Sequence, residues 1–173
     1  TWRQEPAVIV LKGLKKRFGF GDAEHFASDG FFLTIEKGEF IAIMGPSGCG
    51  KTTLLNVLGL LDSSVEGEYE LDGKSIASLS KRRQAHIRSD QIGFVFQSFN
   101  LINRLNILDN VALPLIYKGV PKLKRLQQAS KMLHAFHLGE REFYMPNQLS
   151  GGQMQRVAIA RALVNNPSII LAD

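Results

Sequence analysis

The chain has 173 residues, 45% of them hydrophobic and 21% charged, and its formal net charge is +5. This length and composition fit one globular domain, alone or with a small subdomain, and exclude a disordered, collagen-like or coiled-coil chain. The modest positive charge suits an anionic ligand, a membrane surface or nucleic acid and selects none of them. A single cysteine, Cys49, excludes an internal disulfide. No apolar run approaches the roughly 18 residues of a membrane span, so we expect no integral membrane segment in this chain.

Strand-like and helix-like segments alternate along the sequence. Short β-branched apolar runs predict strands at 7–11, 31–35, 92–96 and 168–172. The segment 69–71 leads into Asp72-Gly73, a dipeptide that predicts a turn. The continuous apolar run 40–44 predicts a strand buried on both faces, as in a parallel sheet. Helical patterns follow at 52–61, 81–89 and 152–164, and from 107 to about 136 with breaks at Gly119 and Pro121. The order predicts an α/β core with an inserted helical subdomain.

A glycine-rich loop follows the predicted strand 40–44 and precedes a predicted helix. It matches the phosphate-loop (P-loop) pattern G-x-x-x-x-G-K-[ST] with Gly45, Pro46, Ser47, Gly48, Cys49, Gly50, Lys51 and Thr52. Such a loop turns successive N–H groups inward around phosphate oxygens, and the helix N-terminus adds partial positive charge. We expect Lys51 to reach the β- and γ-phosphates, the Thr52 hydroxyl to bind Mg²⁺, and Thr53 to help hold the α-phosphate. Cys49 fills a free position, where a small side chain without chemistry is the favoured interpretation over a reactive thiol.

A second motif, Leu149-Ser150-Gly151-Gly152-Gln153, stands before an apolar helix that only Arg161 interrupts near its end. From the residues alone it is a capped helix N-terminus, which can bind an anion. In this context the chain resembles the ATP-binding cassette (ABC) ATPases, whose signature is LSGGQ. Phe96-Gln97 matches that family's Q-loop, and 169–173 matches its Walker B strand. The residues 96–102 and 109–115 resemble the branch of macrolide-exporter and lipoprotein-release ATPases, with the cell-division ATPase as a relative.

The resemblance implies a P-loop NTPase (RecA-like) core with an N-terminal antiparallel β portion and an inserted helical subdomain. It divides the chain into a core at 1–96, a Q-loop and helical subdomain at 97–148, and a signature helix with Walker B strand at 149–173. It also implies that further strands, a Glu directly after Asp173 and a later His complete the family's fold and site. We therefore expect these 173 residues by themselves to bind nucleotide weakly and to hydrolyse it poorly or not at all.

The resemblance also assigns roles to single residues. Phe18 stacks on adenine, with Phe20 as a rival. Gln97 senses Mg²⁺ and the attacking water, and Asp173 holds Mg²⁺. The catalytic set is then Lys51, Gln97 and Asp173. The γ-phosphate bound by a second subunit faces Ser150, Gly151, Gly152 and Gln153, because the family closes as a head-to-tail dimer around two ATP molecules.

The leading hypothesis is therefore the ATPase subunit of a membrane transporter that exports or releases its substrate. ATP and Mg²⁺ are its cofactors, its partners are a transmembrane permease and a second ATPase subunit, and it lies on the cytoplasmic face of the inner or plasma membrane. A nucleotide-gated scaffold of the cell-division type, without transport, stays open. An ABC ATPase acting on nucleic acid is disfavoured because 97–148 is too short for a coiled-coil insertion, and LSGGQ disfavours a small-molecule kinase. Two hypotheses are weaker than the alternative of solvated side chains. One is a metal site at His134 and His137. The other is nucleic-acid contact by the basic clusters of Lys81, Arg82 and Arg83 or of Lys122, Lys124 and Arg125.

Overall fold

The fold is described from a computed structural model covering residues 7–18, 25–62 and 66–173. It divides into two compact units, residues 1–84 and 85–173, which are treated separately below. The predicted segments 1–96, 97–148 and 149–173 are defined by sequence motifs, whereas the two units are defined by packing. The three-segment division stays a prediction.

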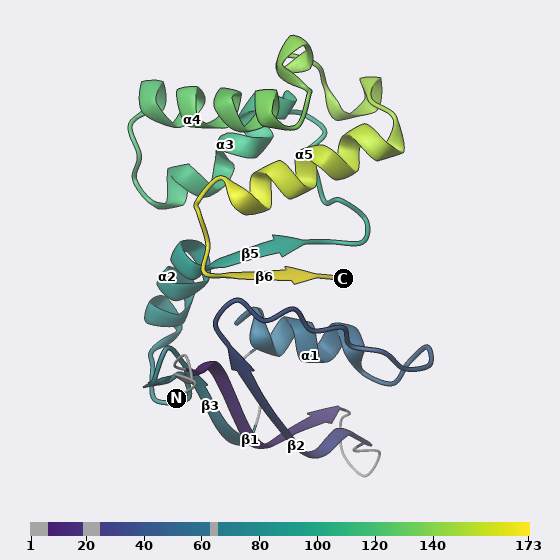
Figure 1. The fold of residues 1–173 in the computed structure, drawn as a ribbon, viewed down its shortest axis with the longest axis vertical. Helices are drawn as coiled ribbons and strands as arrows, with labels where there is room; N and C mark the ends of the chain where they lie inside the picture. The colour runs from purple at the N-terminus through teal and green to yellow at the C-terminus, as the bar shows by residue number, and fades with distance from the viewer. Residues whose placement is uncertain (1–6, 19–24, 63–65) are drawn as a thin grey trace, which may run out of the picture. The chain divides into compact units, whose positions relative to one another are not determined.

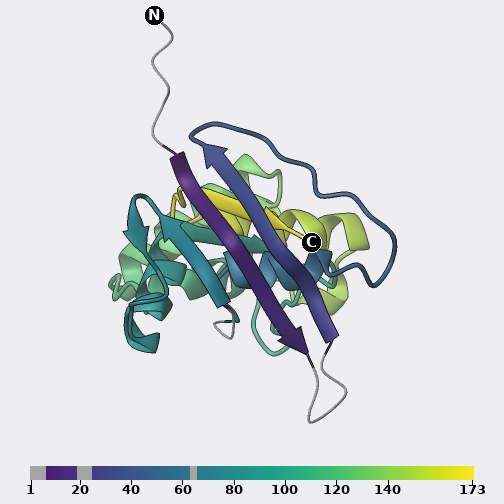
Figure 2. The same cartoon turned by 90° about the horizontal axis from the view of Figure 1, so that it is seen from below.

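Unit 1 is built on an antiparallel sheet with the strand order β2-β1-β3-β4. The long strands β1 (Ala7–Phe18) and β2 (His25–Glu36) run side by side, as Figure 2 shows, and β3 (Glu66–Leu71) pairs with the other edge of β1. The predicted Asp72-Gly73 turn is confirmed: both residues have positive φ and join β3 to β4 (Lys74–Ser75) as a two-residue hairpin. This sheet is the N-terminal antiparallel portion expected from the sequence.

Helix α1 (Lys51–Leu58) follows the P-loop and belongs to unit 1. Its end is tied to β3 because the buried Tyr69 hydroxyl donates a 2.9 Å hydrogen bond to the Leu58 carbonyl. Burial raises the pKa of Tyr69 well above its usual range. The core of the unit comprises Ile9, Leu11, Leu14, Leu55, Val57, Leu58, Leu60, Tyr69, Leu71 and Ile76.

The predicted strand at 40–44 is wrong. Residues 39–46 have no regular secondary structure, and no described strand pairs with them. Phe40 and Met44 are 92% and 88% exposed, so the two-sided burial that the apolar run indicates is not met. An extended segment becomes a strand only when its N–H and C=O groups pair with a neighbour, and apolar composition alone does not supply that neighbour.

Unit 2 contains a parallel strand pair and three packed helices. Strands β5 (Ile92–Val95) and β6 (Ile169–Ala172) pair in parallel, with Ile92 beside Ile169 and Val95 beside Ala172. Helix α5 (Gly151–Leu163) lies along this pair, and α3 (Ile107–Tyr117) and α4 (Lys122–Ala135) lie on its other side (Figure 1). Their shared core comprises Ile107, Leu108, Val111, Ala112, Ala129, Leu133, Leu138, Leu149, Val157 and Ala160. The inserted helical subdomain is therefore present.

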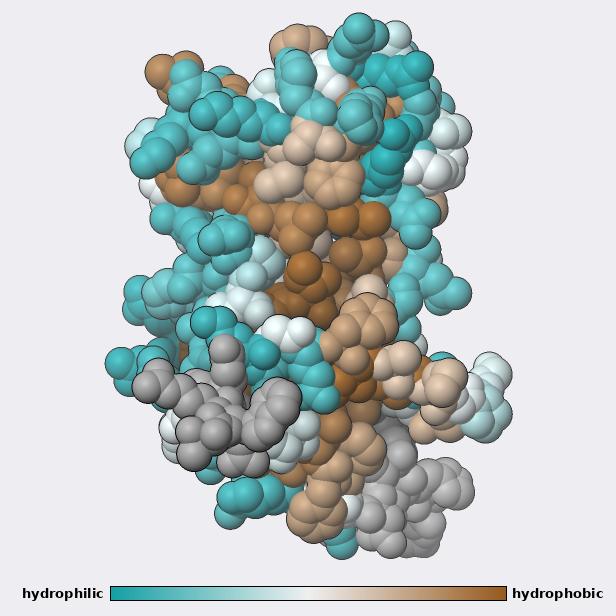
Figure 3. Space-filling model, viewed as in Figure 1, coloured by the Kyte–Doolittle hydropathy of each residue, from teal (hydrophilic) through white to brown (hydrophobic). Residues whose placement is uncertain are grey.

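Gly93 explains how α5 comes so close to β5. A Cβ at Gly93 would collide with the carbonyl oxygen of Ala162 in α5 and lie 3.0 Å from Cγ of Pro167. Only glycine permits this approach of helix backbone to strand backbone. Apolar side chains show at the surface over α5 and the β5–β6 pair in Figure 3, and Ile170 of β6 is 53% exposed.

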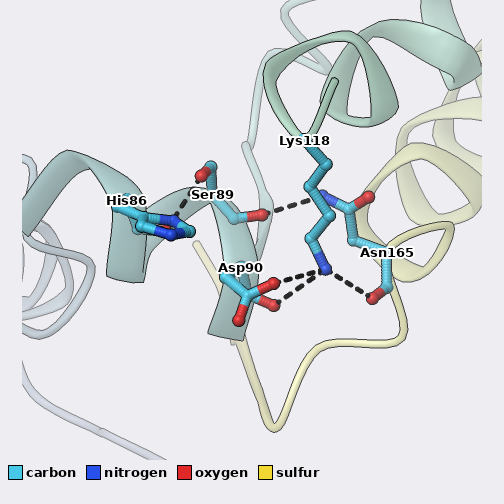
Figure 4. A network of polar contacts seen from close by, with 5 residues as sticks. All are labelled: His86, Ser89, Asp90, Lys118 and Asn165. Carbon is cyan, nitrogen blue, oxygen red and sulfur yellow. Dashed lines mark hydrogen bonds and ion pairs between the residues drawn. The ribbon is translucent and has the colours of Figure 1, made fainter. Parts of the chain in front are cut away.

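A polar network joins the ends of three helices in unit 2 (Figure 4). The Lys118 ammonium, just after α3, pairs with Asp90 Oδ1 at 2.7 Å and donates to the carbonyls of Asp90 and Asn165. Asp90 lies at the end of α2 (Lys81–Gln91), and Asn165 follows α5 and donates to the Ser89 carbonyl. The hydrogen bond from Lys118 holds the pKa of the Asp90 carboxyl below its ordinary value. Lysine suits this place because helix C-terminal carbonyls favour a cation.

Candidate functional site

The P-loop is formed in unit 1 at the N-terminus of α1. Gly48 and Gly50 have φ of +80° and +91°, a left-handed conformation that glycine adopts without steric cost. A Cβ at Gly45 would lie 2.7 Å from Cys49 Sγ, so this position is closely approached by the other side of the loop. The first hydrogen bond of the helix runs from the Leu54 amide to the Gly50 carbonyl, which leaves the first-turn amides pointing out of the helix end.

Lys51 lies across this loop. Its ammonium donates to the carbonyls of Gly45 at 2.9 Å and Pro46 at 2.8 Å, and it is 3.7 Å from Cys49 Sγ. These contacts hold the positive charge over the loop, whose residues from Gly45 to Cys49 are exposed. A curled backbone, a helix N-terminus and a lysine ammonium together fit a phosphate chain. The thiol of Cys49 is free and exposed beside that ammonium.

Gln97 and Asp173 lie together at one edge of the parallel pair in unit 2. Gln97 follows the end of β5 by two residues, and Asp173 directly follows β6. The Asp173 amide donates a 3.0 Å hydrogen bond to the Val95 carbonyl, which fixes the two strand ends next to each other. Both residues are exposed. An amide oxygen and a carboxylate at adjacent strand ends are donors that Mg²⁺ accepts.

The signature motif forms the N-terminus of α5. Ser150 is the N-cap: its hydroxyl accepts from the Gln153 amide at 3.4 Å, and the Gln153 side chain accepts from the Ser150 amide at 2.9 Å. This reciprocal capping box fixes the start of the helix. A Cβ at Gly151 or Gly152 would meet nothing within 4 Å, so the fold of this unit leaves open space there.

The predicted site residues therefore lie in two sets. Unit 1 brings together the P-loop with Thr52 and Thr53. Unit 2 brings the ends of β5 and β6 together, with Gln97 and Asp173, and it holds Ser150 to Gln153 separately at the start of α5. Phe18 ends β1, but its side chain lies outside the described residues, as does all of Phe20. The roles of these residues toward ATP and Mg²⁺ stay predictions.

His134 and His137 do not share the one helix face that their spacing suggests. His134 lies in α4, whereas His137 follows the helix with φ of +57°, and the described residues contain no group of three or more His, Cys, Asp or Glu suited to a metal. Both line a hollow of about 630 Å³ next to Gln153 and Arg156. The side chains of Lys81, Arg82 and Arg83 are exposed, as are those of Lys122 and Lys124. Exposure is common to solvated side chains and to a nucleic-acid contact, so the choice between them stays a prediction.

Two residues that shape the site were not predicted. The fully buried Asn110 accepts from the Ile102 amide and donates to the carbonyls of Ile102, Leu105 and Asn106, which fixes the segment after the Q-loop. Arg161 donates to the carbonyls of Phe99 and Asn100, and burial lowers the pKa of its guanidinium. The signal in the sequence is a lone charged residue in the apolar end of α5 for Arg161, and an Asp109-Asn110 pair in an otherwise apolar helix for Asn110.

Comparisons with known proteins agree with this arrangement. A family model described as ABC transporter matches residues 29–173. The chain is 46% identical to YknY, an uncharacterized ABC transporter ATP-binding protein of Bacillus subtilis, over 96% of this chain and 72% of that protein. It is 49% identical to the macrolide export ATP-binding/permease protein MacB of Rhodopirellula baltica, over 96% of this chain and 25% of MacB. The chain thus spans about three quarters of the first relative and a quarter of the second.

Solved structures give the same result. The dimeric post-hydrolysis state of the ATP-binding cassette MJ0796, bound to ADP and Pi, matches with a TM-score of 0.87 and 47% identity, covering 95% of this chain and 73% of that chain. The fold class expected from the sequence, a P-loop NTPase cassette, is confirmed. No described helix has the length and apolar character needed to cross a membrane. With a family match over most of its length, a formed P-loop and a capped signature helix, the chain belongs to the ABC transporter family.

Proposed function

We propose that this chain binds and hydrolyses ATP as the motor subunit of an exporting or releasing ABC transporter. Closure of a head-to-tail dimer around ATP would drive a partner permease, with the subunit on the cytoplasmic face of the membrane. Identity of 46–49% to MacB relatives from several bacteria supports the export branch, and the dimeric form of MJ0796 supports the dimer. Because MacB is four times longer than the matched region, the permease and the substrate belong to this proposal.

The observation that carries the proposal is the open space around Gly151 and Gly152. Neither glycine has a positive φ, and a Cβ at either position would have no described atom within 4 Å outside its own turn of helix. The fold of unit 2 does not need glycine at these positions, and alanine would favour the helix by about 1 kcal/mol at a full interior position. The other physical reason for glycine is close approach of an outside group to the backbone. A phosphate held on a second subunit is such a group, and the helix N-terminus favours its charge.

The residues divide the chemistry among them. Lys51 and the P-loop amides would neutralise the phosphates, with Thr52 and Asp173 holding Mg²⁺, which adds charge neutralisation when bound. Gln97, beside Asp173, would orient the attacking water. Ser150 to Gln153 would complete the site of the partner copy. The expectation that these 173 residues alone turn ATP over poorly stays a prediction.

The test is the variant Gly151→Ala in the full-length protein, followed by thermal unfolding and by light scattering with ATP and no Mg²⁺. We expect an unchanged or slightly higher melting temperature, since the methyl group would have no described neighbour within 4 Å outside its own turn of helix, together with loss of the ATP-dependent dimer. Lys118→Met, on a surface away from the signature, is the matched control and should keep the dimer. A Gly151→Ala protein that dimerises as well as wild type would refute the proposed role of the signature.

A further inference from the structure

The backbone directly after Gln97 is held in an unusual conformation. Phe99 and Asn100 both have positive φ, +60° and +46°, although neither is glycine. For a residue with a Cβ the left-handed region costs on the order of 1 kcal/mol, and asparagine tolerates it better than phenylalanine. Two main-chain hydrogen bonds support this turn: the Phe99 amide donates to the Phe96 carbonyl, and the Asn100 amide donates to the Ser98 carbonyl. Two consecutive left-handed residues need a further contact to persist.

Arg161 of α5 supplies that contact. One terminal nitrogen donates to the Asn100 carbonyl and the other to the Phe99 carbonyl, both at 2.7 Å. The guanidinium suits this task because its donors form a rigid planar fork, and charge-assisted bonds of this length are strong. The side chain is half-buried, so water replaces these bonds poorly. We call the two bonds the Arg161 contact.

The Arg161 contact connects two motifs through one helix. Ser150 caps the start of α5 and Arg161 lies eleven residues later, about 16 Å along the helix axis. Helix α5 also packs closely on β5, the strand that leads to Gln97, because Gly93 leaves room for Ala162. A displacement of the signature end is therefore carried by a stiff helix to the loop that holds Gln97.

We propose that Arg161 is a positioning residue: by holding the carbonyls of Phe99 and Asn100 it fixes Gln97 and couples the signature helix to the Q-loop. The inference rests on the proposed function, because Gln97 acts in the same ATP site. The Arg161 contact adds nothing to nucleotide affinity in this account. Its loss changes the turnover rate and leaves the binding of ATP by the P-loop unaltered.

The test compares Arg161→Lys with the matched control Arg156→Lys in the full-length protein. Arg156 lies on the same helix and donates to a carbonyl, that of Phe136, which is remote in sequence from the Q-loop. Lysine keeps the charge and lacks the fork, so in Arg161→Lys we expect amide exchange at Phe99 and Asn100 to rise about tenfold. We expect kcat to fall about tenfold while KM for ATP changes less than about twofold. Arg156→Lys should leave both quantities at the wild-type level.

A pair of loop variants tests the inference without touching Arg161. Asn100 is exposed, so substitution there leaves the core intact. Asn100→Ala makes the left-handed conformation more costly and should lower kcat several-fold, whereas Asn100→Gly adopts it freely and should keep wild-type kcat. These variants decide the matter if Arg161→Lys does not fold.

The proposal stands only if exchange and kcat change together in Arg161→Lys. Faster exchange with unchanged kcat would overturn the positioning role, and reduced kcat with unchanged exchange would overturn the contact as its cause. Equal losses in Arg156→Lys would indicate general damage to α5 and overturn it as well. A wild-type protein without ATP turnover would contradict the proposed function, and amide exchange would still decide the Arg161 contact.

Discussion

Gly93→Ala tests the packing that places the signature helix against the Q-loop strand. The added Cβ would collide with the Ala162 carbonyl oxygen and lie 3.2 Å from its carbonyl carbon and 3.0 Å from Pro167 Cγ. Two of the three neighbours are backbone atoms of α5, which move only if the helix moves. Overpacking of a core costs about 1–3 kcal/mol, and contact with backbone places this variant at the upper end. At about 2–4 °C per kcal/mol for a protein of this size, the melting temperature should fall by roughly 6–12 °C.

The assay is urea unfolding followed by circular dichroism, with the free energy of unfolding compared between variants. Gly119→Ala is the comparison, because its Cβ would meet nothing within 4 Å while its φ is +71°. That variant reports backbone strain alone, about 1 kcal/mol. If Gly93→Ala destabilised the protein no more than Gly119→Ala, the close approach of α5 to β5 would be refuted.

Three further outcomes follow from the structure. Alkylation of Cys49 with N-ethylmaleimide should abolish ATP binding, because the modified sulfur lies 3.7 Å from the Lys51 ammonium. Bound ATP should slow the alkylation. Loss of ATP binding in a Cys49→Ala protein treated with the reagent would contradict this prediction. Asn110→Leu should lower the free energy of unfolding by about 3 kcal/mol or more, since it leaves buried main-chain groups around Ile102 unpaired; a loss below about 1 kcal/mol in denaturant unfolding would show that these bonds contribute little. The pKa of Asp90 is lowered in the folded state. Its contribution to the free energy of unfolding is therefore present above the pKa of the unfolded state and is lost as the pH falls through the pKa of the folded state. Lys118→Met should remove this loss of unfolding free energy at acid pH, which stays within about 1 kcal/mol for an exposed pair. If the free energy of unfolding depended on pH identically in the two proteins, the assignment to Asp90 would be refuted.

Much of the fold follows from local patterns in the sequence. The helices at 81–91, 107–117, 122–135 and 151–163 match their predicted segments within a few residues because caps and breakers mark their ends: Asn106 and Ser150 cap, and Gly119 with Pro121 breaks. Asp72-Gly73 similarly specifies its hairpin. These features depend on neighbours in the chain, which the sequence displays directly.

The remainder depends on neighbours in space. Residues 40–44 are apolar enough for a buried strand, yet strand formation requires a paired partner that the described residues do not provide. The P-loop and the signature can be predicted because each is a short run with fixed glycine spacing, which the sequence displays directly. Asn110 and Arg161 could not be assigned, since their acceptors lie on loops whose path the sequence pattern does not specify.

The most direct test of the central claim is ATP turnover by the full-length wild-type protein and by Lys51→Met, with Mg²⁺ present. Lys51 contacts only carbonyls and a thiol of its own loop among its described hydrogen bonds, so the variant should fold normally, as thermal unfolding can verify. We predict phosphate release by the wild type and a rate at least about 100-fold lower in Lys51→Met, because removing a charge that stabilises the transition state costs about that much. A wild-type protein that releases no phosphate, or a Lys51→Met protein that hydrolyses ATP as fast as wild type, would contradict the account.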